Sequence, residues 1–148
     1  MKLVYLDNAA TTPIDSEVIK IITKTMTEIY GNPSSTHQFG RKAKNLVETA
    51  RKNIANLLQV SAAEIIFTAG GTEADNLILH NAVNNLGIER IITSKIEHHA
   101  VLHTVTFLKE KYSTEIDYVD IDTSGDVSIT HLEKLLKKSN KKTLVSLM

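Results

Sequence analysis

The sequence predicts an α/β fold in which a mostly parallel β-sheet is flanked by helices. Short apolar segments that suit buried strands alternate with longer segments in which apolar residues recur at helical spacing. Parallel strands need crossover connections, and the intervening helices supply them. The 148 residues are 42% hydrophobic and 23% charged, which suffices for one domain with a core.

Charge and residue content exclude several classes of protein. The 17 Lys and Arg residues balance 17 Asp and Glu residues, so there is no electrostatic case for binding nucleic acid or an anionic membrane. The absence of cysteine rules out a disulfide, a thiolate metal site and a cysteine nucleophile within these residues. No apolar run approaches the ~20 residues that span a bilayer. Asp7 comes too early for a secretory signal, so we expect a cytoplasmic location.

The first part of the chain predicts two helices separated by a turn. Asp15 is placed to cap a helix that continues to about Tyr30, and a second helix is expected from about Phe39 to Leu58. Between them, the stretch from Gly31 to Ser35 breaks the helical pattern. A short turn is expected at residues 61–64, which resemble a capping box directly followed by a strand-like segment.

The rest of the chain predicts alternating strands and helices. Strands are expected over residues 65–68, 90–94, 115–119 and 143–148, and helices over 72–86, 98–112 and 130–138. The last strand has the apolar character of a central strand, and no turn or polar segment follows it. We therefore expect the chain to be cut from a longer one, with a terminal strand at a sheet edge as the alternative.

Two glycines mark the first candidate site, between the strand predicted at 65–68 and the helix after it. Gly70 and Gly71 allow close approach of a ligand and tolerate positive φ, and Thr72 with Asp75 forms a capping-box pattern. Free N–H groups of the first helical turn, with the helix dipole, would bind an anion. The stretch lacks the lysine of a nucleoside-triphosphate loop and the spacing of a dinucleotide fingerprint. A glycine turn without a ligand is the alternative.

Histidines mark the second candidate site, which follows the next strand and is expected at the same sheet edge. His99 and His103 share one helix face, but no third metal ligand is evident and we expect no metal. His98 is either an aromatic platform for a planar ligand or an exposed histidine without a role. The spacing of these residues does not choose between the two.

Four motifs, in order, resemble the class V, fold-type I pyridoxal 5′-phosphate (PLP) enzymes, and specifically the cysteine desulfurases of iron–sulfur cluster assembly. The motifs are Tyr5 to Pro13, Gly31 to Ser35 with His37 and Phe39-Gly40, Ile66 to Asn76, and Thr93 to Leu102. Together they extend over almost the whole chain.

The resemblance implies the N-terminal part of an aspartate aminotransferase-like fold. Residues 1–15 would lie near the active-site mouth, and residues 16–148 would form an incomplete PLP-binding large domain. Gly71 and Thr72 match the positions that bind the cofactor phosphate. His98 matches the histidine that stacks on the pyridine ring and assists proton transfer.

The resemblance also implies an activity. Such enzymes convert L-cysteine to L-alanine and pass the sulfur, as a persulfide, to an iron–sulfur scaffold or a tRNA-thiolation partner. They are homodimers. The family's cofactor-binding lysine, the aspartate that pairs with the pyridine nitrogen and the nucleophilic cysteine lie beyond the position of Met148, so these residues alone are expected to be inactive. Alternatives are a selenocysteine lyase, another class V enzyme, or a non-catalytic truncated interaction module.

Overall fold

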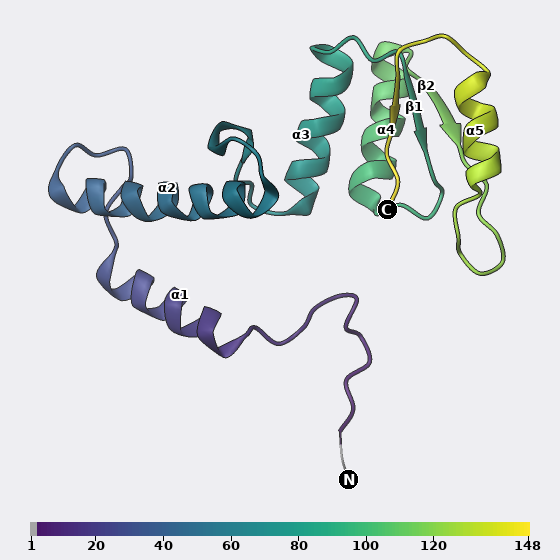
Figure 1. Cartoon of the computed structure of the whole chain (residues 1–148). Helices are drawn as coiled ribbons and strands as arrows, with labels where there is room; N and C mark the ends of the chain where they lie inside the picture. The colour runs from purple at the N-terminus through teal and green to yellow at the C-terminus, as the bar shows by residue number, and fades with distance from the viewer. Residues whose placement is uncertain (1–2) are drawn as a thin grey trace. The chain divides into compact units, whose positions relative to one another are not determined.

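The computed structural model describes residues 3–148, and the chain divides into one unit up to Ile66 and a second from Phe67 to Met148 (Figure 1). Residues 1 and 2 of the predicted N-terminal segment 1–15 lie outside the described residues. The placement of that segment near an active-site mouth stays a prediction. Among residues 3–148, no helix is both long enough and apolar enough to cross a membrane.

The first unit consists of helices whose ends are set by local hydrogen bonds. Helix α1 (Ser16–Glu28) begins after Asp15, whose carboxylate accepts a hydrogen bond from the Glu17 N–H at 2.8 Å. Helix α2 (Gln38–Leu58) follows, and a single turn, η1 (Ala62–Glu64), closes with the Ser61 N–H donating to the Glu64 carboxylate at 2.8 Å. Both predicted helices and the predicted turn are confirmed.

Two glycines let the turn between α1 and α2 lie directly against the start of α2. The Ser35 N–H donates to the Asn32 carbonyl at 2.9 Å, which folds the turn back. A Cβ atom added at Gly40 would lie 2.7 Å from that same carbonyl oxygen and would also clash with the Ser35 carbonyl. At Gly31 an added Cβ would clash with the backbone of Phe39. The close approach of backbone to backbone therefore requires glycine at both positions.

The second unit contains a three-stranded parallel sheet with strand order β2-β1-β3. Its elements are α3 (Gly71–Asn84), β1 (Arg90–Thr93), α4 (His99–Tyr112), β2 (Glu115–Tyr118), α5 (Ile129–Lys137) and β3 (Thr143–Val145). β1 pairs in parallel with both other strands. The predicted parallel sheet is confirmed.

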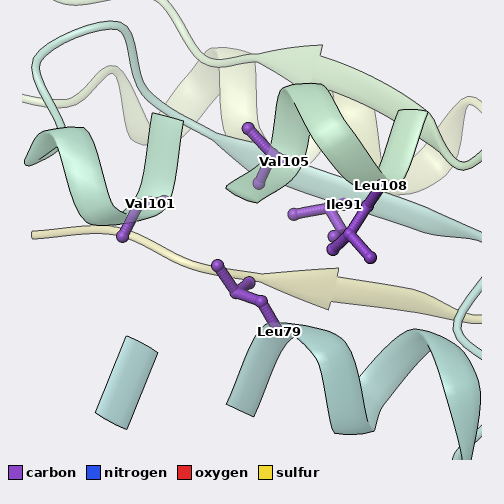
Figure 2. Packing of buried hydrophobic residues seen from close by; sticks show 5 residues of the cluster. All are labelled: Leu79, Ile91, Val101, Val105 and Leu108. Carbon is purple, nitrogen blue, oxygen red and sulfur yellow. The ribbon is translucent and has the colours of Figure 1, made fainter. Parts of the chain in front are cut away.

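Neighbouring residues of β1 point to opposite faces of the sheet, and each face has its own apolar cluster. Ile91 packs with residues of α3 and α4, and Figure 2 shows this cluster: Leu79, Ile91, Val101, Val105 and Leu108. Ile92 packs on the other face with Val119 and, from α5, Leu135. Helices thus cover both faces, as expected for parallel strands.

One strand prediction is wrong. Residues 65–68 form no strand, and Ile66 and Phe67 are 68% and 46% exposed. A strand exists only where its backbone groups bond to a neighbouring strand, and no strand within residues 3–148 pairs with this segment. The strand predicted from Thr143 is present as β3 but ends at Val145, and among the described strands it pairs with β1; its expected central position stays a prediction.

A buried arginine ties β1 to β2 and α5. Arg90 is fully buried, and its Nε donates to Asp117 Oδ2 at 2.7 Å. Its Nη1 donates to the Leu135 carbonyl at 2.9 Å, and Glu115 lies within 3.6 Å of the guanidinium. The ammonium nitrogen of Lys138 lies 3.3 Å from Asp117 Oδ1 and forms a second ion pair with this carboxylate. A buried charge is tolerated only with such partners, so this network fixes β1 and β2 side by side with α5 across them.

Because of Asp117, we expect the free energy of unfolding to decrease when the pH drops below about 4. Burial alone would raise the pKa of Asp117, but hydrogen bonds and charges from Arg90 and Lys138 outweigh it and hold this pKa below its ordinary value of 3.8. The unfolded chain therefore takes up this proton more readily than the folded one. The stabilisation is complete above the unfolded-state pKa and is lost as the pH falls through the folded-state pKa.

Urea unfolding followed by far-UV circular dichroism at several pH values measures this effect. Asp117→Asn should remove that part of the pH dependence and lower stability by about 3 kcal/mol, because it weakens the pairing of a buried arginine. Glu110→Gln, at an exposed position of α4, is the matched control and should leave the pH profile unchanged. An Asp117→Asn profile that parallels the unaltered chain would contradict the assignment.

Candidate functional site

Helix α3 begins at Gly71, with Gly70 as its N-cap residue. Thr72 is therefore the second helical residue, and the prediction that Thr72 caps the helix together with Asp75 is wrong. The carboxylate of Glu73 instead reaches back and accepts a hydrogen bond from the Ala69 N–H at 2.7 Å. A glutamate in the first turn is long enough to bond to the backbone ahead of the helix. Glu73 therefore makes the kind of side-chain bond that was expected from Thr72 and Asp75.

The N-terminus of α3 has backbone donors that no side chain caps. Gly70 has no side chain, and no side-chain hydrogen bond caps the helix there. A Cβ atom added at Gly70 or Gly71 would meet nothing within 4 Å, so the space in front of the first turn is open. Gly70 has φ 167°, which is extended backbone, so the tolerance of glycine for positive φ is not used there. Open N–H groups at the positive end of a helix dipole are suited to an anion.

His98 occupies the corresponding place at the start of α4. It is the N-cap residue, and its Nδ1 accepts a hydrogen bond from the Ala100 N–H at 3.1 Å. Because Nδ1 accepts, the proton of the neutral ring lies on Nε2. The side chain is exposed, so the imidazole is held by its own helix and is available to a ligand.

Thr72 and His98 open onto the same cavity, as the sequence predicts. The cavity has a volume of about 490 Å³ and is lined by Thr72, Asn76, His80, His98, His99, Ala100, His103, Thr104 and Phe107. A second hollow, lined by residues 69–73 and Asn76, shares Thr72 and Asn76 with it. The open end of α3 borders the second hollow, the imidazole of His98 borders the cavity, and Thr72 and Asn76 line both.

His99 and His103 lie together on one face of α4, as their spacing predicts. Their ring centroids are 5.3 Å apart. Within residues 3–148, no third histidine, cysteine, aspartate or glutamate joins them in a group able to hold a metal ion. The two imidazoles therefore lie on the wall of the cavity, and two ligands are fewer than a metal centre needs.

Glu97, directly before His98, has a structural role that sequence reasoning missed. Its side chain is buried, and Oε1 accepts hydrogen bonds from the Ser94 hydroxyl at 3.1 Å and from the Met148 N–H at 2.7 Å. The carboxylate thus joins the loop that carries His98 to the segment that follows β3. No local pattern could reveal this contact, because the donor is 51 positions away in the chain.

Known proteins share both the sequence and the fold of this chain. It is 44% identical over 147 residues to cysteine desulfurase IscS of Dictyoglomus turgidum, an alignment that covers 98% of this chain and 36% of the relative. It is 45% identical over 139 residues to putative cysteine desulfurase IscS 1 of Bacillus subtilis, with 93% and 36% covered. A solved NifS-like protein superposes with a TM-score of 0.85 at 39% identity, with 95% and 38% covered.

These similarities confirm the resemblance to cysteine desulfurases and the partial PLP-transferase fold. The chain spans only 36% of the length of the two curated relatives, so it corresponds to one part of such a protein. Residues 4–148 match the family described as aminotransferase class-V. Because this match extends over nearly the whole sequence, the chain belongs to the class-V aminotransferase family.

Proposed function

We propose that these residues form the part of a cysteine desulfurase that anchors the phosphate of PLP and faces its pyridine ring. The complete protein would convert L-cysteine to L-alanine and deliver the sulfur, as a persulfide, to an iron–sulfur scaffold or a tRNA-thiolation partner. The observation that carries the proposal is that Thr72, in the uncapped first turn of α3, and His98 line one cavity. Similarity above 40% identity to cysteine desulfurases supports the choice of reaction.

The open end of α3 fits a phosphate group. Gly71 and Thr72 lie in the first turn, where backbone N–H groups have no side-chain cap. Thr72 is exposed and adds a hydroxyl donor. Charge-assisted hydrogen bonds from these groups, together with the helix dipole, would hold the phosphate dianion. Gly71 presents no side chain that would shield these donors.

His98 fits the ring end of the same ligand. The hydrogen bond from Ala100 to Nδ1 orients the imidazole and leaves the proton on Nε2. A flat, exposed ring at the cavity wall can stack on a pyridine ring, and Nε2 can hold or release a proton beside it. When bound, PLP supplies an electron sink for the substrate carbon.

Sulfur transfer needs groups outside these residues. The chain contains no cysteine, and a thiolate is the nucleophile that takes sulfur from L-cysteine. By resemblance, the lysine that holds the cofactor and the aspartate that pairs with the pyridine nitrogen also belong to the longer protein. A homodimer follows from the same resemblance. The cytoplasmic location expected from the sequence stays a prediction.

Binding of two probes separates the two ends of the proposed site. Pyridoxine 5′-phosphate keeps the ring and the phosphate but carries an alcohol in place of the aldehyde, so it cannot react with surface lysines. Thr72→Val should weaken both this compound and inorganic phosphate by about tenfold, because a hydrogen bond to a charged group is lost. His98→Ala should weaken only pyridoxine 5′-phosphate. Isothermal titration calorimetry measures both affinities.

Thr72→Ser keeps the hydroxyl and is the control for Thr72→Val. Pyridoxine without phosphate reports any binding that does not use the end of α3. Equal weakening of both probes by His98→Ala would show that the histidine acts only through the fold. Unchanged phosphate binding in Thr72→Val would contradict the proposed anchor.

Residues 1–148 alone should not release alanine from L-cysteine. They would retain phosphate anchoring and ring stacking, but they have no thiolate to accept sulfur. The purified chain is mixed with PLP and L-cysteine under reducing conditions, and both alanine and sulfide are followed. A complete cysteine desulfurase serves as the positive control. Alanine formation above the background of free PLP would overturn this prediction.

A further inference from the structure

We propose that Asn76 and Thr104 are positioning residues that set the spacing between the phosphate-binding end of α3 and His98 at the start of α4. This inference rests on the proposed function, in which one ligand contacts both places. Neither residue needs to touch that ligand to act in this way. Their role is to hold two helices in register at the end where the ligand binds.

A side-chain amide connects the two helices. Asn76 Nδ2 donates to the Thr72 carbonyl at 2.7 Å, within α3. The hydroxyl of Thr104, on α4, donates to Asn76 Oδ1 at 2.8 Å. Asn76 is half-buried and Thr104 is only 5% exposed, so water competes little for the bond between them. In the part of the chain that the structure describes, the bond from Thr104 to Asn76 connects a side chain of α4 to a side chain of α3.

The Thr72 carbonyl fixes which way the Asn76 amide faces. If the amide were turned over, its oxygen would face that carbonyl oxygen and two acceptors would meet. The amide nitrogen therefore points to Thr72, and the amide oxygen is left to receive the Thr104 proton. The orientation of the link is thus set from within α3, by the residue that carries the proposed phosphate contacts.

The series of contacts continues on α4 as far as His98. Thr104 Oγ1 also lies 2.7 Å from the Ala100 carbonyl, which shares the single hydroxyl proton with Asn76. Ala100 in turn donates its N–H to His98 Nδ1 at 3.1 Å. Thr72, Asn76, Thr104, Ala100 and His98 all line the same cavity. A chain of short polar contacts therefore runs along the cavity from one proposed ligand contact to the other.

The apolar core below this chain of contacts should keep the helices packed when the link is removed. Leu79 of α3 and Val105 and Leu108 of α4 are at most 2% exposed and share one cluster (Figure 2). Loss of the Asn76–Thr104 bond should thus loosen the ligand end of the helix pair without unfolding it. A ligand that spans both helices would feel this change, while one that binds only the end of α3 would not.

The test compares pyridoxine 5′-phosphate, which would span both helices, with inorganic phosphate, which would bind α3 alone. Thr104→Val removes the hydroxyl at nearly constant volume. It should weaken pyridoxine 5′-phosphate by about fivefold, the size of one net hydrogen bond, and leave phosphate affinity within about twofold. Thr104→Ser keeps the hydroxyl and should restore binding. Asn76→Ala should match Thr104→Val, and the double variant should be no weaker than either single one.

Circular dichroism spectra and melting curves establish that each variant is folded. If Thr104→Val fails to fold, Asn76→Ala at its half-buried position carries the same comparison. The inference would be overturned if a variant bound both probes as tightly as the unaltered chain does. It would also be overturned if a variant bound both probes more weakly by the same factor. If the unaltered chain binds neither probe, the proposed function fails and the inference fails with it. If the unaltered chain binds both probes but the variants change the affinity for both probes equally, the inference fails and the proposed function stands.

Discussion

The parallel pairing of β1 with both β2 and β3 is the constraint on which the second unit depends. Strands that run in the same direction need a connection that returns along the sheet, and here α4 follows β1 and α5 follows β2. Ile91 and Ile92 point to opposite faces, and each belongs to a separate apolar cluster. The buried Arg90 adds a polar restraint on the face of α5, where its guanidinium bonds to Asp117 and to the Leu135 carbonyl.

The candidate site follows from where this arrangement leaves helix ends. The loop after β1 carries Glu97 and His98, and its buried carboxylate bonds to Ser94 and to Met148. Packing of α3 against α4 brings the start of α3 to the same cavity as His98. The positive end of a helix dipole and an exposed imidazole thus face one space, which suits a planar ligand with an anionic group.

Helix α1 of the first unit has an apolar stripe that remains exposed. Helix α1 has the predicted spacing and cap, yet no residue of α1 is buried, and Val18 and Ile22 are 46% and 44% exposed. Periodicity therefore predicts the helix correctly without stating what covers its apolar face. The turn that follows is more constrained, because Gly31 and Gly40 permit a backbone contact that any side chain would block.

The sequence by itself determined most helices and turns, the parallel sheet and the two loops that form the candidate site, because caps and periodicity act within a few residues of each other. It misplaced the cap of α3, where Glu73 rather than Asp75 bonds back to the chain. Only the tertiary structure decided that residues 65–68 form no strand, that Arg90 pairs with Asp117, and that Asn76 meets Thr104. These contacts join residues 27 and 28 positions apart, or depend on a neighbouring strand, so they form only once the sheet and its helices have brought distant segments together.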